Sequence, residues 1–332
     1  MTDAGPMRVI IDTDPGLDDA VAILHALAVP RFRVEAITAV AGNIGLATTT
    51  RNVGGLLAVM GQGGIPYAAG AAGPLAGGGR SEIAIHGADG LGGVPLPPAL
   101  APPDGRAVTT LLAAHLLEAP AGSLHVLALG PLTNLALLAR DAPEAYGRIG
   151  RIIAMGGTID EPGNAGHFAE FNMAADPLAA RMVLAAGVPV TLIPLDVTRK
   201  LRATPADLDR LAAFGTPPAT LAADLIRAYF AGHAERSSRP LHDPCVMLMA
   251  DAPALFGTER MRLAVDCDAH PGRLVQTPDG TEIEVALRID AGAALDHLWQ
   301  GLGGAGQAAG RSASTSRVQK AMPGRMAASL KS

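Results

Sequence analysis

The sequence predicts an α/β protein with an open, mostly parallel sheet and helices on both faces. Short apolar runs alternate with amphipathic helical segments along most of the chain, which is the pattern of strand–helix–strand units. Of the 332 residues, 49% are hydrophobic, enough to bury a sizeable core. The length fits one large α/β domain or two ordinary ones. Ligands of such sheets bind beyond the carboxyl ends of the strands.

The first elements establish the alternation. Residues 7–12 form a short apolar run with β-branched side chains, typical of a strand covered on both faces. Residues 18–29 begin with acids and continue with apolar positions, which favours a helix. The same reasoning predicts strands at 33–40, 124–129, 151–155 and 188–195, and helices at 49–60, 132–140 and 177–186.

The C-terminal part adds helices and an edge to the sheet. Strands at 262–266 and 282–289, with a turn at Asp279-Gly280, fit a late addition to the sheet edge. From Gly303 the composition changes to Gly, Ala and Ser with five cations and no acid. We therefore expect one domain over 7–302 and a disordered basic tail over 303–332. The helices predicted here are 219–235, 243–250 and a closing helix at 291–302.

Charge and cysteine content exclude several classes of protein. A net charge of -5 does not suggest a nucleic-acid or membrane binder, which would need a basic face. The basic tail could touch RNA or anionic lipid, but we expect a solvated extension, so neither nucleic acid nor membrane is an expected partner. The two cysteines, Cys245 and Cys267, exclude a disulfide scaffold and a Cys-rich metal site. The first residues show no targeting signal. We therefore expect a cytoplasmic protein.

Two long segments interrupt the alternation. Residues 70–104 are rich in Gly and Pro, and residues 156–172 are polar. Structureless loops of this length inside a compact domain are usually functional. The loops that follow the predicted strands also lie at the edge of the sheet where ligands bind.

Four carboxylates lie within eight consecutive residues at the end of the first predicted strand, Asp12-Thr13-Asp14-Pro15-Gly16-Leu17-Asp18-Asp19, which we call the octet. Two like charges about 4 Å apart cost about 4 kcal/mol at an effective dielectric of about 20, so the crowding indicates a cation among them. Oxygen donors without a nearby His or Cys point to a hard ion, Ca²⁺ or Mg²⁺. The first turn of a helix also favours acids, which accounts for Asp18 and Asp19 but not for Asp12 and Asp14.

Two further clusters carry chemistry. Asn164, Glu170 and Asn172 lie in the second long segment, where they could bridge the hydroxyls of a sugar or simply cap the loop. His242 and Asp243 directly precede a proline. They could form an acid/base or metal-binding pair, a helix start with Asp243 as the cap, or both.

The octet resembles the N-terminal signature of the inosine–uridine-preferring nucleoside hydrolases. Each motif is modest alone, but the full set in one order is highly specific, and it covers about residues 7–302. The further matches, in order, are Ala41-Gly42-Asn43, His86-Gly87-Ala88-Asp89-Gly90-Leu91-Gly92, Leu129-Gly130-Pro131-Leu132-Thr133-Asn134, Met155-Gly156-Gly157, Ala169-Glu170-Phe171-Asn172 and His242-Asp243-Pro244.

The resemblance implies a sheet of Rossmann-like topology, hydrolysis of the N-glycosidic bond of ribonucleosides, a tightly bound Ca²⁺ and a homo-oligomer, either dimer or tetramer. Asp12 would support the acidic loop, and His86 would lie near the base. The implied ligands of the ion are the side chains of Asp14, Asp19 and Asp243 and the carbonyl of Leu129, where the family usually has Thr. The implied ribose contacts are Asp18, Asn43, Asn164, Glu170 and Asn172.

In the implied reaction, Asp14 activates a Ca²⁺-bound water that attacks the anomeric carbon of an oxocarbenium-like ribose. His242 protonates the departing base. The helix before the His–Asp pair offers Tyr229 and Phe230 as further residues on the base side. The preference for purine or pyrimidine stays open.

Two other functions are considered alongside this one. A Mg²⁺-dependent phosphatase of the haloacid dehalogenase type would account for Asp12-x-Asp14. That class wants Thr or Val where this chain has Gly16, and a phosphate-binding Lys, yet Lys200 is the only one in the globular part. A non-catalytic nucleoside- or sugar-binding protein on the same fold would need neither Asp14 nor His242.

Overall fold

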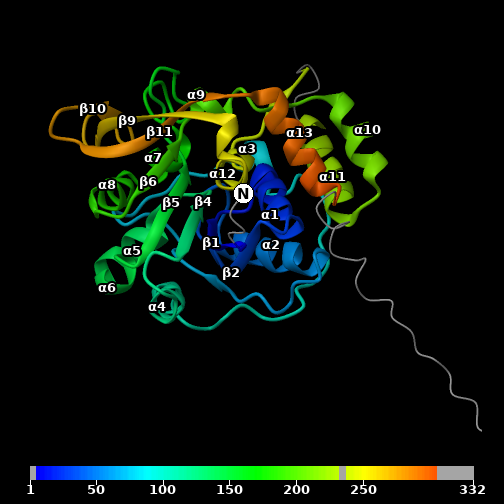
Figure 1. The fold of residues 1–332 in the computed structure, drawn as a ribbon, viewed down its shortest axis with the longest axis horizontal. Helices are drawn as coiled ribbons and strands as arrows, with labels where there is room; N and C mark the ends of the chain where they lie inside the picture. The colour runs from blue at the N-terminus through cyan, green and yellow to red at the C-terminus, as the bar shows by residue number, and fades with distance from the viewer. Residues whose placement is uncertain (1–4, 232–236, 305–332) are drawn as a thin grey trace, which may run out of the picture.

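The computed structural model describes residues 5–231 and 237–304. The predicted tail beyond residue 304 and the end of the predicted helix 219–235 therefore lie outside the described residues. Within them, nine strands form one sheet in the order β10-β9-β11-β6-β5-β4-β1-β2-β3 (Figure 1). Those strands are β1 (Met7–Thr13), β2 (Phe32–Ala39), β3 (Tyr67–Ala69), β4 (Leu124–Ala128), β5 (Ile149–Met155), β6 (Val190–Ile193), β9 (Phe256–Val265), β10 (Leu274–Gln276) and β11 (Thr281–Ile289).

The sheet is mostly parallel, as predicted. Every neighbouring pair from β3 across to β11 is parallel, and β9 alone among these nine strands runs the other way, pairing antiparallel with β11 and with the edge strand β10. This edge is the predicted late addition, and it extends beyond the body of the molecule (Figure 1). Strand β9 begins earlier than predicted because Phe256 pairs with Ile289, so the two long strands match along their length.

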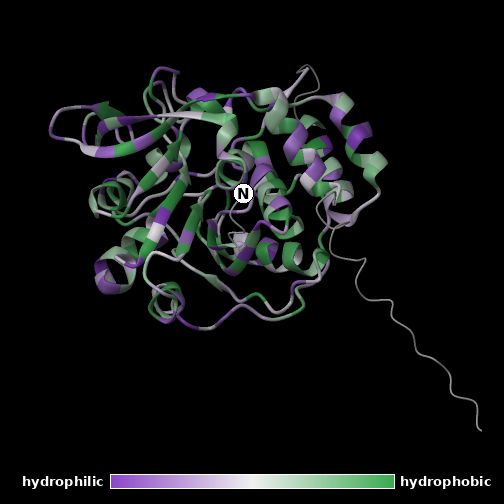
Figure 2. Cartoon of the chain, viewed as in Figure 1, coloured by the Kyte–Doolittle hydropathy of each residue, from purple (hydrophilic) through white to green (hydrophobic). Residues whose placement is uncertain are grey.

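Helices cover both faces of the sheet because its strands are apolar on both sides. Along β1, Val9 and Ile11 pack into one core, whereas Ile10 packs into the other. Figure 2 shows the hydrophobic residues along the central strands and the hydrophilic ones toward the outer helices. The first core contains α1 (Leu17–Ala28), α2 (Leu46–Val59), α11 (Pro217–Ala231), α12 (Pro244–Asp251) and α13 (Ala291–Leu302). The second contains α4 (Val108–Glu118), α5 (Thr133–Asp141), α6 (Pro143–Tyr146) and α8 (Pro177–Ala185).

Several elements have no counterpart in the sequence prediction. Helix α3 (Ile83–His86) lies within the loop predicted over 70–104, and helix α7 (Phe171–Ala175) begins at the end of the loop predicted over 156–172. Most of these elements are too short for a periodic pattern, and only two positions of α10 are buried. The other unpredicted elements are β3, α4, α6, α9 (Leu195–Thr198), α10 (Pro205–Phe214), the 3₁₀ turn Pro253–Leu255, β10 and the small sheet of β7 (Arg202–Ala203) and β8 (Arg239–Pro240).

The order of strands reverses beside β1. The chain passes from β1 to β2 and β3 on one side, and then crosses to β4 on the other side of β1. At such a switch point the loops leaving neighbouring strands diverge and open a crevice at their carboxyl ends. The acidic octet follows β1 at this point.

Within residues 5–231 and 237–304, none of the helices has the length and apolar character needed to cross a bilayer.

Candidate active site

A cavity enclosing about 570 Å³, part of it open to solvent, lies at the carboxyl ends of the central strands. It brings together residues from the octet, from the loops after β2, β4 and β5, and from the start of α12. Nine of the eleven predicted site residues line it, namely Asp18, Asn43, His86, Leu129, Asn164, Glu170, Asn172, His242 and Asp243. The other two, Asp14 and Asp19, are buried beside these carboxylates.

Asp19 is fixed in place by four donors. Its Oδ1 accepts from the Thr13 hydroxyl (2.7 Å) and the Asp14 amide (3.3 Å). Its Oδ2 accepts from the Gly16 amide and from Asn43 Nδ2, both at 3.0 Å. Asp19 therefore closes the turn between β1 and α1 around its own carboxylate, and its position is set before any ligand arrives.

Asp12 anchors the base of the same loop. Its Oδ1 accepts from Asn134 Nδ2 (2.7 Å) and from the Thr38 hydroxyl, which joins β1 to β2 and α5. Burial raises the pKa of Asp12 to about 6, although both hydrogen bonds oppose that shift. The carboxylate supports the loop from beneath and does not line the cavity.

Asp14 has one bound and one free oxygen. Its Oδ2 accepts from the Asn43 amide (2.7 Å), while Oδ1 is buried without a hydrogen-bond partner among the described residues. Glycines surround the carboxylate, since a Cβ at Gly42 or Gly130 would overlap its oxygens. Burial, followed by the charge of Asp19, raises the pKa of Asp14 well above its usual value. The site thus holds a buried acceptor that lacks a positive partner.

Asp243, from the C-terminal part of the chain, adds a further carboxylate to the site. Asp243 is the N-cap of α12, yet its side chain makes no capping bond. Carboxylate oxygens of Asp18, Asp19 and Asp243 instead lie within 4.8 Å of one another. Burial, then the charges of Asp19, Asp18 and Asp14, raise the pKa of Asp243 well above its usual value. Oxygen donors crowded in this way fit a hard divalent cation.

The tightest convergence differs in one member from the ligand set implied by sequence. Asp18 belongs to the three carboxylates that meet, whereas Asp14 lies outside that group. Asp18 Oδ2 also accepts from the His242 backbone amide (3.1 Å), which ties the octet to the start of α12. The motif in the sequence therefore cannot tell whether Asp14 or Asp18 faces an ion, because this depends on the positions of the side chains in the fold.

The loop after β5 supplies amides and one acid. Asn172 Nδ2 donates to the Leu129 carbonyl (2.6 Å), whose second lone pair remains for another partner. Glu170 caps α7 by accepting from the amides of Asn172 (2.8 Å) and Met173 (3.1 Å). Burial raises the pKa of Glu170 to about 7 against these bonds. Glu170 therefore caps a helix and also lines the cavity, so the two roles considered from the sequence, capping and contact with a sugar, do not exclude each other.

Asn164 likewise stabilises the loop and borders the cavity. Its Oδ1 accepts from the Phe171 amide (2.8 Å), so the side chain closes the loop while it borders the cavity.

His242 is oriented by a residue that the sequence analysis missed. Its Nδ1 shares a hydrogen bond of 2.8 Å with the Thr198 hydroxyl, which leaves Nε2 as the ring nitrogen available to a ligand. Burial lowers the pKa of His242, and the nearby Asp18 charge opposes that shift. Thr198 follows β6, so the rule that sites lie beyond strand ends could have identified it.

Two aromatic rings form part of the remaining wall, and a buried cation packs on one of them. The rings of His86 and Tyr229 are stacked with centroids 6.4 Å apart, and the guanidinium of the buried Arg239 lies 3.8 Å from the Tyr229 ring centre. His86 Nδ1 accepts from the Leu17 amide (3.0 Å), so its ring is fixed to the start of α1. Of the two aromatic residues considered on α11, Tyr229 lines the cavity and Phe230 packs against the core. No sequence signal identified Arg239.

Comparisons with known proteins converge on one family. A family model described as inosine-uridine preferring nucleoside hydrolase matches residues 9–296. The chain is 40% identical over 270 residues to a pyrimidine-specific ribonucleoside hydrolase RihA of Klebsiella pneumoniae, covering 79% of this chain and 85% of the relative. Among solved structures, a plant nucleoside hydrolase superimposes with a TM-score of 0.82 at 30% identity, covering 90% of this chain and 99% of that one. A purine-preferring ribonucleoside hydrolase from Gardnerella vaginalis gives 0.83 at 26% identity, with the same coverage.

Proposed function

Because the chain belongs to the inosine-uridine preferring nucleoside hydrolase family and is a ribonucleoside hydrolase, we propose that it cleaves its substrate with Asp14 as the general base and His242 as the general acid. The observation that carries this proposal is the buried oxygen of Asp14, which has no partner among the described residues, in a site whose cavity is lined by His242. A binding protein would need neither group. We further propose that the catalytic domain spans 7–302, since α13 ends at Leu302.

We propose a preference for pyrimidine ribonucleosides. The relatives named pyrimidine-specific are about 40% identical to this chain. The solved structures named purine-preferring or inosine-guanosine hydrolase are only 26% and 28% identical. The stack of Tyr229 on Arg239 offers a flat surface beside which a base could lie, and it carries no group that demands a purine.

Ca²⁺ is the proposed metal, because the family is metal-dependent and the donors that converge are all oxygens. The residues that would hold it are Asp14, Asp19, Asp243 and the carbonyl of Leu129, with Asp18 adjacent. The unpartnered oxygen of Asp14 and its glycine cradle fit such an ion. When bound, the ion supplies positive charge that lowers the pKa of a neighbouring water.

The remaining steps belong to side chains of this protein. Asp14 takes a proton from water as the water oxygen bonds to the anomeric carbon. The bond from that carbon to the base nitrogen breaks, and His242, protonated on both ring nitrogens with Nδ1–H donated to the Thr198 hydroxyl, gives its Nε2 proton to the leaving base and becomes neutral. Thr198 holds the ring of His242 in the orientation that this transfer needs. Asn164, Glu170 and Asn172 border the place where ribose hydroxyls would lie, and contacts that tighten as the ring flattens accelerate the reaction.

A substrate panel tests the proposed function. Purified protein with Ca²⁺ is expected to release ribose from uridine and cytidine at least tenfold faster than from inosine or adenosine. A chelator should stop the release, and added Ca²⁺ should restore it, because the ion would supply the positive charge that lowers the pKa of the attacking water. The measurement is reducing sugar per enzyme per unit time.

The alternatives give separate outcomes in the same assay. Bound but intact nucleoside would favour the binding protein, and activity restricted to phosphate esters would favour the phosphatase. Faster release from inosine would overturn the pyrimidine preference and leave the hydrolase assignment intact.

The glycine cradle gives a second prediction. In Gly130→Ala the new methyl group must displace the Asp14 carboxylate, and a misplacement of about 1 Å can cost about 10²-fold in kcat/KM. Gly45→Ala is the matched control, because nothing lies within 4 Å of a Cβ there and its φ of -66° suits alanine. Wild-type kcat/KM in Gly130→Ala would show that the carboxylate position does not limit the reaction.

A further inference from the structure

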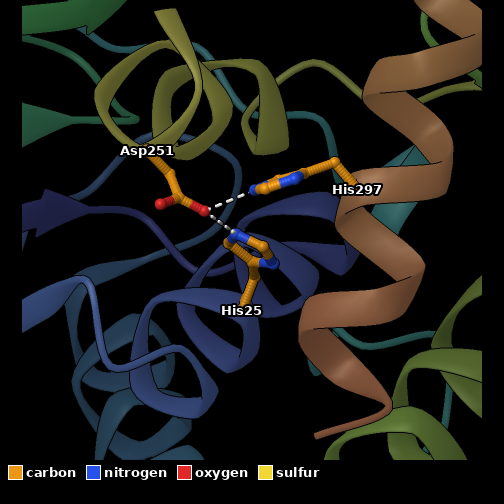
Figure 3. Close-up of side chains that lie close together, drawn as sticks. All are labelled: His25, Asp251 and His297. Carbon is orange, nitrogen blue, oxygen red and sulfur yellow. Dashed lines mark hydrogen bonds and ion pairs between the residues drawn. The ribbon is translucent and has the colours of Figure 1, made fainter. Parts of the chain in front are cut away.

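We propose that His25, Asp251 and His297 form a second metal site, separate from the active-site carboxylates and suited to Zn²⁺ or a similar transition-metal ion. The three side chains come from α1, α12 and α13, and Figure 3 shows both imidazoles pointing at one carboxylate oxygen. None of them lines the active-site cavity.

The distance from His25 to Asp251 fits shared coordination, whereas His297 is in direct hydrogen-bond contact with the same carboxylate. Nε2 of His297 lies 2.6 Å from Asp251 Oδ2, and Nε2 of His25 lies 3.6 Å from the same oxygen. One ligand atom from each residue lies within 4.8 Å of the other two. Zinc binds nitrogen and carboxylate oxygen at about 2.0 to 2.1 Å, so two ligands of a tetrahedral ion lie about 3.3 Å apart. A small opening of the His297 contact would therefore admit an ion.

The burial of the His25 ring without hydrogen bonds among the described residues independently supports a metal ion at this place. The His25 side chain is completely buried, and within residues 5–231 and 237–304 neither ring nitrogen has a hydrogen-bond partner. The separation of 3.6 Å from Asp251 is too long for a hydrogen bond, yet it matches two ligands of one ion. Buried polar groups without any partner are rare in folded proteins, and an ion is one of the few explanations.

The helices are arranged to bring these groups together. His25 lies in the last turn of α1 and Asp251 ends α12, so two negative helix C-termini face the site. On α13, Gly301 lies one turn after His297, and a Cβ there would come within 2.5 Å of the His25 ring. The close approach of α13 to α1 therefore depends on a glycine next to the proposed ligands.

The donor set distinguishes this site from the first. Two imidazoles and one carboxylate suit Zn²⁺ and related ions, whereas the active site offers oxygens that suit Ca²⁺. The His297 side chain is 40% exposed, which leaves a path for the ion and a position for water.

The proposed ion would hold together the C-terminal ends of α1 and α12, and the active-site acids lie at the N-terminal ends of these two helices. On α1, His25 lies seven positions after Asp18, a distance of about 10 Å along the helix axis. Asp243 and Asp251 stand at opposite ends of α12 in the same way. The site is thus a structural clamp at a distance from the reaction.

The test measures metal content and melting temperature in protein without an affinity tag. Metal-free protein is saturated with Ca²⁺ and then titrated with Zn²⁺. We expect one tightly bound equivalent of Zn²⁺ and a melting temperature that rises with Zn²⁺ concentration. In His297→Ala the Zn²⁺ affinity should fall at least tenfold, and the rise in melting temperature should disappear.

Two variants separate this site from other places where Zn²⁺ could bind. His115→Ala, which removes a half-buried histidine from α4, should keep the Zn²⁺ equivalent, and so should Asp14→Asn in the active site. Absence of a tight Zn²⁺ equivalent in the wild type, or its full retention in His297→Ala, would overturn the proposal. Loss of the equivalent in Asp14→Asn would do so too, because it would place the ion in the active site.

Discussion

Replacing Asp14 with Asn should lower kcat/KM for a ribonucleoside by at least about 10³-fold and leave the fold intact. A general base contributes about 10² to 10⁴-fold, and the substitution also removes a negative charge from the proposed cation site. Asparagine keeps the shape of the side chain and can still accept the Asn43 amide. It cannot take a proton from water where Asp14 Oδ1 now stands.

The same variant has an opposite effect on stability. Because burial and the Asp19 charge raise the pKa of Asp14, the charged form destabilises the folded protein at neutral pH when no cation is bound. In the presence of a chelator, Asp14→Asn should therefore melt at the same temperature as the wild type or higher. If misfolding caused the loss of activity, the melting temperature of Asp14→Asn would instead be lower than that of the wild type.

The control is Asp209→Asn, which removes a carboxylate from the exposed side of α10 and should keep wild-type activity. Activity of Asp14→Asn within tenfold of the wild type would refute its assignment as the base.

Replacing His242 with Ala should slow natural nucleosides by about 10² to 10⁴-fold, the usual contribution of a general acid. A p-nitrophenyl riboside, whose leaving group departs without protonation, should lose less than tenfold. The reason is that His242 Nε2 is the free ring nitrogen at the cavity, whereas Nδ1 is bonded to Thr198. The measurement is kcat/KM for both substrates in both proteins.

A structural role for His242 would give a different pattern. If the ring serves only to hold the start of α12 in place through its hydrogen bond to Thr198, both substrates should suffer equally. Equal losses on uridine and on the activated riboside would therefore remove His242 from the acid role. His115→Ala serves as the histidine control for this experiment as well.

Local patterns in the sequence were sufficient for the main framework. The buried strands 7–12 and 151–155 and the closing helix 291–302 were predicted because strongly apolar runs and clear helix ends are local signals. The parallel sheet followed from their alternation, and the rule about strand ends then placed the octet and the loop over 156–172 at one edge. Short elements such as β3 escaped prediction because three residues hold no period.

The site was predicted as a set of residues, and its internal contacts came only from the tertiary structure. Sequence order cannot tell that Asp18 meets Asp243, or that Thr198 orients His242, since these partners are brought together by the packing of α1, α9 and α12. The grouping of His25 with two residues more than two hundred positions away has no local signal at all. In this protein the chain itself determined which chemical groups stand at the strand ends. The packing of helices against the sheet decided which of those groups touch, because contact between distant segments depends on how they pack and not on their spacing along the chain.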